Sequence, residues 1–176
     1  MKKIIVSLMV AITTVYSTAV IAQQDPVSKL FGRYAGKEGF TSVYVTGDML
    51  KMASNCDPEN QDLSFLSRLT EVRVLAQECA EGQSSELNFH AEIWPNLDHT
   101  AYKELLIVKE KDQDVKIVAR ENGDVITEFL IIVSGSDENV LVQIKGSINL
   151  NELDKLSDSF DIEGFDQLKK LEEAKN

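Results

Sequence analysis

The chain has 176 residues, 43% of them hydrophobic, and a formal net charge of −11 at pH 7. This length suits one domain with a buried core. The acidic balance disfavours nucleic-acid binding, because an acidic surface repels phosphates, and it suits a protein kept soluble by its charge. A cationic partner or a divalent metal is the other reading of this charge.

The first 22 residues predict a secretory signal peptide. Lys2 and Lys3 precede an apolar run over residues 4–15, and Ala22 ends a stretch suited to signal-peptidase cleavage. The alternative is a retained membrane anchor, but a spanning helix needs about 20 apolar residues and this run is shorter. No lipobox cysteine follows the run. We therefore expect a periplasmic or secreted mature chain, residues 23–176, with no transmembrane segment and, without the two lysines, a net charge of −13.

The first half of the mature chain predicts helices separated by short strands. Asp25 and Pro26 are typical of a helix start, and Gly36 and Gly39 of its end. After that helix we expect a strand at 41–45, a helical turn at 49–52, a helix that begins at Asp57 and Pro58 and carries Leu63, Phe65, Leu66 and Leu69, and a strand at 71–77.

The second half predicts mostly strands. A helix that starts near 84–86 is interrupted by Pro95. Asn122 and Gly123 lie between two apolar runs and give the strongest hairpin signal in the chain. The expected strands cover 105–110, 115–120, 125–134 and 140–145. A C-terminal helix capped by Asn149 or Asn151 follows, with apolar stripes of Leu150, Leu153 and Leu156 and then Ile162, Phe165, Leu168 and Leu171.

These elements predict a single α+β domain over residues 23–176. Its sheet is mostly antiparallel with helices packed on one face, and it ends in a C-terminal four-strand meander followed by a helix. The alternation of Val140, Val142 and Ile144 with Leu141, Gln143 and Lys145 suits a sheet with one buried face.

The two cysteines, Cys56 and Cys79, leave two alternatives open. An oxidising compartment would let them form a disulfide, worth about 3 kcal/mol by loop entropy. Two free, half-buried thiols are the other alternative, because the spacing in sequence does not fix the distance in space.

No catalytic, cofactor-binding or metal site is predicted. The glycines from Gly32 to Gly39 lack the spacing of a phosphate loop and fit a helix end better. His90 and His99 do not have the spacing of a zinc-binding pair, so exposed or capping roles are expected. Trp94, with Phe89 and Ile93, could line an apolar groove, but core packing is the expected role. The acidic clusters follow no calcium-loop pattern and suit turns and helix starts.

The second half resembles a known family. The residues that carry the resemblance are the run from Tyr102 to Lys111, the strand at 115–120, the run at 126–133, the strand at 140–146 and the closing Gly146-Ser147-Ile148-Asn149-Leu150. They resemble domain-of-unknown-function family 4252, small exported proteins found mainly in Bacteroidetes. The resemblance implies no known activity and no site residues. Many members are lipoproteins, and this chain departs from them because it lacks the lipobox cysteine.

Two functions are compatible with these observations. The first is a non-catalytic exported protein that binds an envelope protein or a second copy of itself; genes of the resembled family near extracytoplasmic sigma-factor systems suggest a signalling accessory. The alternative is an enzyme whose site is assembled from scattered carboxylates or histidines. Export and the lack of catalytic motifs favour the first.

Overall fold

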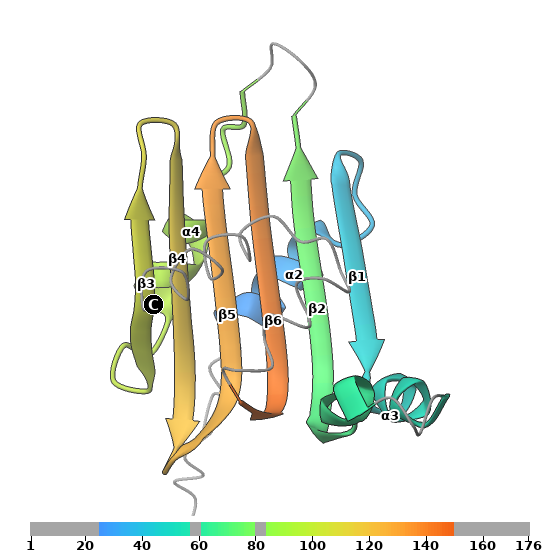
Figure 1. Cartoon of the computed structure of the whole chain (residues 1–176). Helices are drawn as coiled ribbons and strands as arrows, with labels where there is room; N and C mark the ends of the chain where they lie inside the picture. The colour runs from blue at the N-terminus through green and yellow to red at the C-terminus, as the bar shows by residue number, and fades with distance from the viewer. Residues whose placement is uncertain (1–24, 57–60, 80–83, 150–176) are drawn as a thin grey trace, which may run out of the picture.

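One antiparallel sheet organises the chain (Figure 1). The computed structural model describes residues 25–56, 61–79 and 84–149. Its six strands are β1 (Phe40–Thr46), β2 (Leu69–Glu78), β3 (Tyr102–Lys109), β4 (Gln113–Asn122), β5 (Val125–Gly135) and β6 (Glu138–Ile148). They lie in the order β1-β2-β6-β5-β4-β3, and every neighbouring pair is antiparallel. The predicted α+β class is confirmed. The expected signal peptide, the helix start at Asp57 and the C-terminal helix lie outside the described residues.

The predicted four-strand meander corresponds to β3, β4, β5 and β6, which are consecutive in the chain and neighbours in the sheet. Asn122 pairs with Val125 across the expected hairpin, and Gly123 has a φ of 63° in the turn between them. A positive φ suits glycine, which is why this turn could be read from the sequence.

The helical segments are short. They are α2 (Pro26–Tyr34), α3 (Gly47–Cys56), the 3-10 helix η2 (Gln61–Arg68), α4 (Phe89–Ile93) and the 3-10 helix η3 (Trp94–Asn96). The Asp25 carboxylate accepts a hydrogen bond from the Val27 backbone N–H at 3.3 Å, and Pro26 lies in the first turn, as the sequence predicts. α3 begins directly after β1, where the helical turn was expected.

Two helix predictions need correction. The segment with Phe65 is a 3-10 helix, and Leu69 belongs to β2 instead. The helix expected from 84–86 begins only at Phe89, where the Asn88 side chain accepts a hydrogen bond from the Ala91 N–H at 2.8 Å. The Ser85 hydroxyl accepts from the Leu87 N–H at 3.0 Å, and this local bond stabilises a turn in place of the first helical turn.

Both faces of the sheet are buried, which corrects the expectation of helices on one face. α2 and α4 pack against one face, where Leu75, Leu130 and Leu141 are fully buried. α3 and η2 pack against the other face, where Leu50 and Phe65 join a cluster with the sheet. In β5 and β6 successive side chains therefore meet a core on either side, as the near-continuous apolar run at 129–133 indicates in retrospect.

Candidate functional site

A row of polar side chains crosses the sheet on the face that carries α2. Glu71 lies opposite Lys145, Lys145 opposite Glu128, Glu128 opposite Arg120, and Arg120 opposite Tyr102. Directly opposed residues of antiparallel strands point to the same face, and opposite charges in such pairs attract. We call these five residues, from β2 to β3, the polar row.

The charges of the polar row are paired with one another. Lys145 Nζ is 3.4 Å from Glu71 Oε1, and Arg120 Nε is 3.7 Å from Glu128 Oε2. Glu128 is only 5% exposed, and the fully buried Gln143 donates from Nε2 to Glu128 Oε1 at 2.6 Å. A buried carboxylate requires such partners, because its desolvation is costly.

Tyr102 ends the polar row on β3. Arg120 donates from Nη2 to the Tyr102 hydroxyl oxygen at 3.0 Å, and its guanidinium carbon lies 4.6 Å from the centre of the ring. Burial of the phenol and the nearby negative charge of Glu128 raise the pKa of Tyr102. The phenol therefore keeps its proton at neutral pH and acts as a fixed polar group, and folding stability falls when the pH exceeds about 10, the ordinary tyrosine value.

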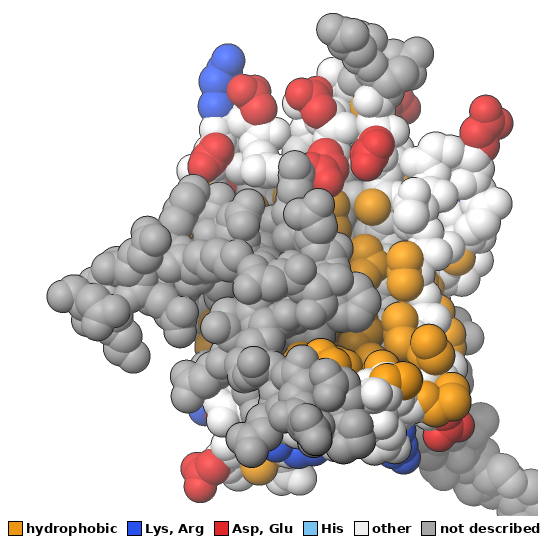
Figure 2. Space-filling view, turned by 45° about the vertical axis from the view of Figure 1, so that its right-hand side comes forward, with side chains coloured by type: hydrophobic (Ala, Val, Ile, Leu, Met, Phe, Trp, Pro, Cys, Tyr) orange, Lys and Arg blue, Asp and Glu red, His pale blue; other side chains and the backbone are white. Residues whose placement is uncertain are grey.

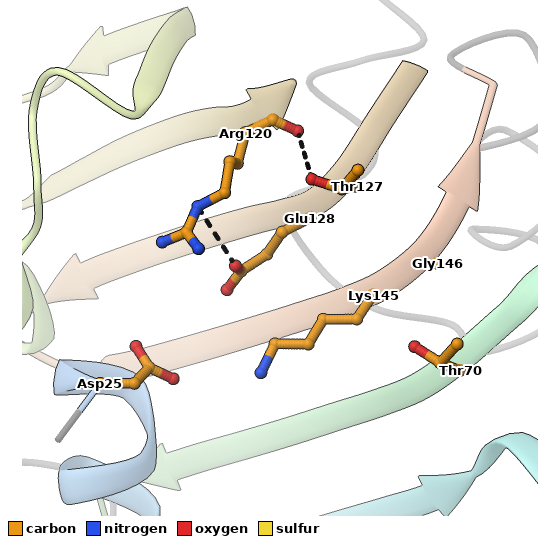
Figure 3. A pocket seen from close by; sticks show the side chains of 7 residues that line it. All are labelled: Asp25, Thr70, Arg120, Thr127, Glu128, Lys145 and Gly146. Atoms are coloured by element: carbon orange, nitrogen blue, oxygen red, sulfur yellow. Dashed lines mark hydrogen bonds and ion pairs between the residues drawn. The ribbon is translucent and has the colours of Figure 1, made fainter. Parts of the chain in front are cut away.

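A pocket of about 480 Å³ lies over the polar row and is open to solvent (Figure 3). Its lining residues are Asp25, Thr70, Arg120, Thr127, Glu128, Lys145 and Gly146. Figure 3 shows the Arg120 side chain reaching toward Glu128, while the Lys145 side chain extends along the pocket toward the Asp25 side. The lining suits a small polar molecule that both donates and accepts hydrogen bonds.

The two carboxylates of this pocket already serve the fold. Asp25 accepts hydrogen bonds from the Val27 N–H and the Ser28 hydroxyl at the start of α2. Glu128 is held by Gln143 and Arg120. Acid–base chemistry needs a carboxyl group that can reach a reacting proton, and both groups here are engaged with protein donors.

Cys56 and Cys79 are both free in the structure. Cys56 ends α3, which packs near the beginning of β2, whereas Cys79 follows the last residue of β2. A ten-residue strand is about 33 Å long, and a disulfide needs Cα atoms within about 7 Å. The structure therefore does not form the disulfide that the sequence left open.

His90 and His99 both contact Trp94. The His90 ring stacks on the indole with centroids 5.8 Å apart, and the His99 ring meets it edge-on at 4.3 Å. Lys116 Nζ lies 3.4 Å from the centre of the indole ring. Burial and the positive charge of Lys116 lower the pKa of His90. Among the described residues, no group of three or more His, Cys, Asp or Glu side chains could hold a metal ion.

Phe89 and Ile93, which precede Trp94 in the sequence, belong to the hydrophobic core. Phe89 and Ile93 are fully buried against the sheet, and Trp94 packs against the same cluster. Core packing was the expected role, and it is confirmed.

Large apolar side chains are exposed along β1 and α3. They are Val43 (39% exposed), Tyr44 (58%), Met49 (54%) and Met52 (58%), and we call them the β1–α3 surface. Figure 2 turns this side of the molecule forward and shows hydrophobic side chains gathered there. Within the described chain, β1 pairs only with β2, so its outer edge has unpaired backbone groups.

The two edge strands of the sheet differ in how they are protected. β1 has the sequence FTSVYVT, with no charge and no proline, and pairs with β2 in unbroken register. β3, at the other edge, carries Lys103, Glu104 and Lys109, and its register shifts between Glu104 and Leu106. Charges and bulges on an edge discourage the addition of another strand, so β1 is the open edge and β3 the protected one.

Comparison with known proteins places the chain in a family. A family model described as "Domain of unknown function (DUF4252)" matches residues 34–156. The chain belongs to this family. Neither the curated proteins nor the solved structures contain a match. The matched residues include all six strands, and therefore both edges of the sheet and the polar row.

No helix within 25–56, 61–79 or 84–149 combines the length and the apolar character needed to cross a bilayer.

Sequence reasoning identified none of the polar row. Glu128 in the apolar strand β5 and Lys145 in β6 were visible as polar interruptions, and such interruptions are the available signal. Their partners depend on strand order and register, which bring β2 beside β6 across some sixty intervening residues. One sequence alone does not fix that pairing.

Proposed function

We propose that this protein is a non-catalytic binding protein that works after export and docks a partner protein on the β1–α3 surface. The observation that carries the proposal is the exposure of four large apolar side chains within the ten residues from Val43 to Met52. Exposed apolar groups gathered on a folded domain are typical of protein interaction sites. An envelope signalling accessory is the role we propose for such a protein.

Strand addition is the mode of binding that this surface favours. An extended segment of a partner can pair with the open edge of β1 through backbone hydrogen bonds. It would then contact Val43 on one face of the sheet and Tyr44 on the other, because successive strand residues alternate. Met49 and Met52, on the helix that follows β1, add flexible apolar contacts.

The polar row supports this proposal indirectly. Tyr44 donates from its hydroxyl to Glu71 Oε2 at 3.0 Å, and the Arg73 guanidinium lies 5.2 Å from the centre of its ring. These contacts fix an exposed tyrosine in one orientation, and a side chain fixed in advance loses less entropy when a partner binds.

A photoreactive amino acid at position 43 tests the proposal in cells that export the protein. We expect a discrete covalent adduct with a partner of defined mass, and we expect Met52→Glu in the same chain to abolish it, because a charge on the surface opposes apolar docking.

The matched control places the photoreactive residue at position 107. Ile107 is 45% exposed on the protected edge strand β3 and resembles Val43 in size and exposure. We expect no adduct there. Absence of an adduct from position 43, or equal adducts from both positions, would overturn the proposal.

A further inference from the structure

The sheet face opposite α2 is apolar well beyond the helices that are described on it. Along β4, β5 and β6 it presents Val115, Ile117, Ala119, Phe129, Ile131, Val133, Val140 and Val142, each at most 4% exposed. We call these eight residues the β4–β6 apolar face. They form one cluster with Leu50 of α3 and with Phe65 and Leu66 of η2.

The described helices reach only one side of this face. α3 packs chiefly against η2, β1 and β2, and η2 against β2 and β6. α4, which contacts β5, lies on the other side of the sheet with Phe89 and Ile93. The eight side chains are nevertheless almost fully buried, so the β4–β6 apolar face has a cover other than the described helices.

The chain leaves the sheet beside this face. β6 ends at Ile148, whose side chain belongs to the same cluster and lies opposite Ile126 of β5. Residues 150–176 follow directly. As a helix, a segment of that length would extend about 40 Å, and strands of ten or eleven residues extend about 35 Å. The remaining chain is therefore long enough to cross the face.

The sequence of the segment has the matching pattern. Leu150, Leu153 and Leu156 recur at helical spacing, as do Ile162, Phe165, Leu168 and Leu171, and acidic and basic residues occupy most positions between them. Each of these two runs, taken as a helix of its own, has one apolar side and one charged side, and such a helix is stable only when its apolar side is buried. In a single continuous helix the two runs together would cover well over half of the surface, so we treat them as two apolar stripes.

We propose that the C-terminal segment, residues 150–176, packs its leucine-rich side on the β4–β6 apolar face of its own chain. A second copy of the protein is the competing occupant. The short connection from Ile148 favours the chain's own segment, because a tethered segment is present at high effective concentration.

A spin label tests the proposal in the full-length mature chain. Cys56 and Cys79 are replaced by serine, and Gln167→Cys carries the label beside Leu168 on the charged side of the segment. We expect the label to broaden the backbone amide signals of residues 115–119 and 129–133 and to leave those of 40–46 sharp.

Isotope mixing separates the two occupants. In the mixed sample one copy carries the spin label but no 15N, and the other carries 15N but no spin label. The observed signals come from the 15N copy, so only a contact between two copies can broaden them. We expect no broadening there. Broadening in the mixed sample, or none on residues 115–119 and 129–133 in the single sample, would overturn the proposal.

A variant pair gives an independent measurement. Phe165→Asp with Leu168→Asp should uncover the face and increase binding of a fluorescent apolar dye, while Asp166→Asn with Gln167→Glu, on the charged side, should leave dye binding unchanged. Equal dye binding by the two double variants would contradict the proposal.

Discussion

Gly146 lies where the backbone of β6 passes close to Arg68 and Leu69. Its φ is +146°, and a Cβ atom there would lie 2.5 Å from the Arg68 carbonyl oxygen and 2.6 Å from the Leu69 Cα. The register between β2 and β6 shifts at this point, between Leu69 and Glu71. A side chain would force β6 away from β2, so the close approach depends on glycine.

Gly146→Ala should therefore lower the free energy of unfolding by about 2 kcal/mol or more. Gly32→Ala is the matched control, because Gly32 lies in α2, a Cβ there meets nothing within 4 Å, and alanine favours a helix by about 1 kcal/mol. Urea unfolding of both variants measures the difference. An unchanged midpoint for Gly146→Ala would show that β6 can move away at no cost.

The pKa of His90 depends in part on the positive charge of Lys116. Burial and the Lys116 ammonium lower the pKa of His90, so protonation is easier in the unfolded chain than in the folded one. Stability accordingly decreases as the pH falls from about 6.5, the ordinary histidine value, toward the lowered pKa of His90. Above 6.5 His90 itself contributes no pH dependence to stability, because it is neutral in both the folded and the unfolded chain.

Lys116→Met should raise the pKa of His90, because it removes a positive charge and keeps a long apolar side chain over Trp94. NMR titration of the His90 ring protons measures the shift. Lys103→Met serves as the control, because Lys103 is exposed and pairs with Glu121. A His90 pKa that is the same in both variants would show that burial, and not the charge of Lys116, lowers it.

At the scale of elements, one buried amide positions α4 on the sheet. Asn139 of β6 is fully buried, and its Oδ1 accepts a hydrogen bond from the Phe89 N–H at 3.3 Å. Its Nδ2 donates to the Leu87 carbonyl oxygen at 3.0 Å and to Gln77 Oε1 at 3.2 Å. The Asn139 side chain thereby provides hydrogen-bond partners for the backbone that leads into α4, and it connects that backbone to β6 and β2.

Asn139→Ala should lower the free energy of unfolding by about 2 kcal/mol, because the buried Phe89 N–H loses its acceptor. The Leu87 carbonyl oxygen and Gln77 Oε1 each lose a donor and are left with the Ser85 hydroxyl. The Phe89 amide hydrogen should also exchange faster with solvent. Asn96→Ala removes an exposed amide that donates to the Glu92 carbonyl oxygen, and it should change stability by no more than about 0.5 kcal/mol. Equal losses in the two variants would argue against the anchoring role of Asn139.

The strands were easier to predict than the helices, for physical reasons. Runs of β-branched residues bounded by turn signals mark β4, β5 and β6, and Gly123 marks the tightest turn. The start of α4 has a local cap, Asn88, but the Phe89 N–H also donates to Asn139 Oδ1, fifty residues further along the chain, and no local pattern reveals that bond. Local sequence therefore predicts these strands, whereas the start of α4 depends also on tertiary contacts.

The candidate site was less predictable than the fold. The polar row needs the register of four strand pairs, and the β1–α3 surface needs the knowledge that β1 is an edge. The sequence of β1, FTSVYVT, is compatible with an edge strand or a central strand, because its side chains do not determine how many neighbouring strands it has. The sequence could therefore indicate a strand there but no surface.

At the scale of the whole molecule, the sheet separates two cores that share the same strands. Val142 of β6 belongs to one core and Leu141 to the other, and both are fully buried. A substitution in β5 or β6 acts on both cores through one backbone. These central strands should therefore be the last part of the molecule to open.

The pairing of β2 with β6 also fixes how long β2 waits during synthesis before its partner strand is made. Glu78 and its partner Glu138 are separated by some sixty residues, and the rest of β6 follows still later. At about 5 to 20 residues per second, a ribosome adds those residues in roughly 3 to 12 seconds. During that time β2 has β1 on one side and nothing on the other. The newly made chain must pass through this interval before its own last strand can close the gap.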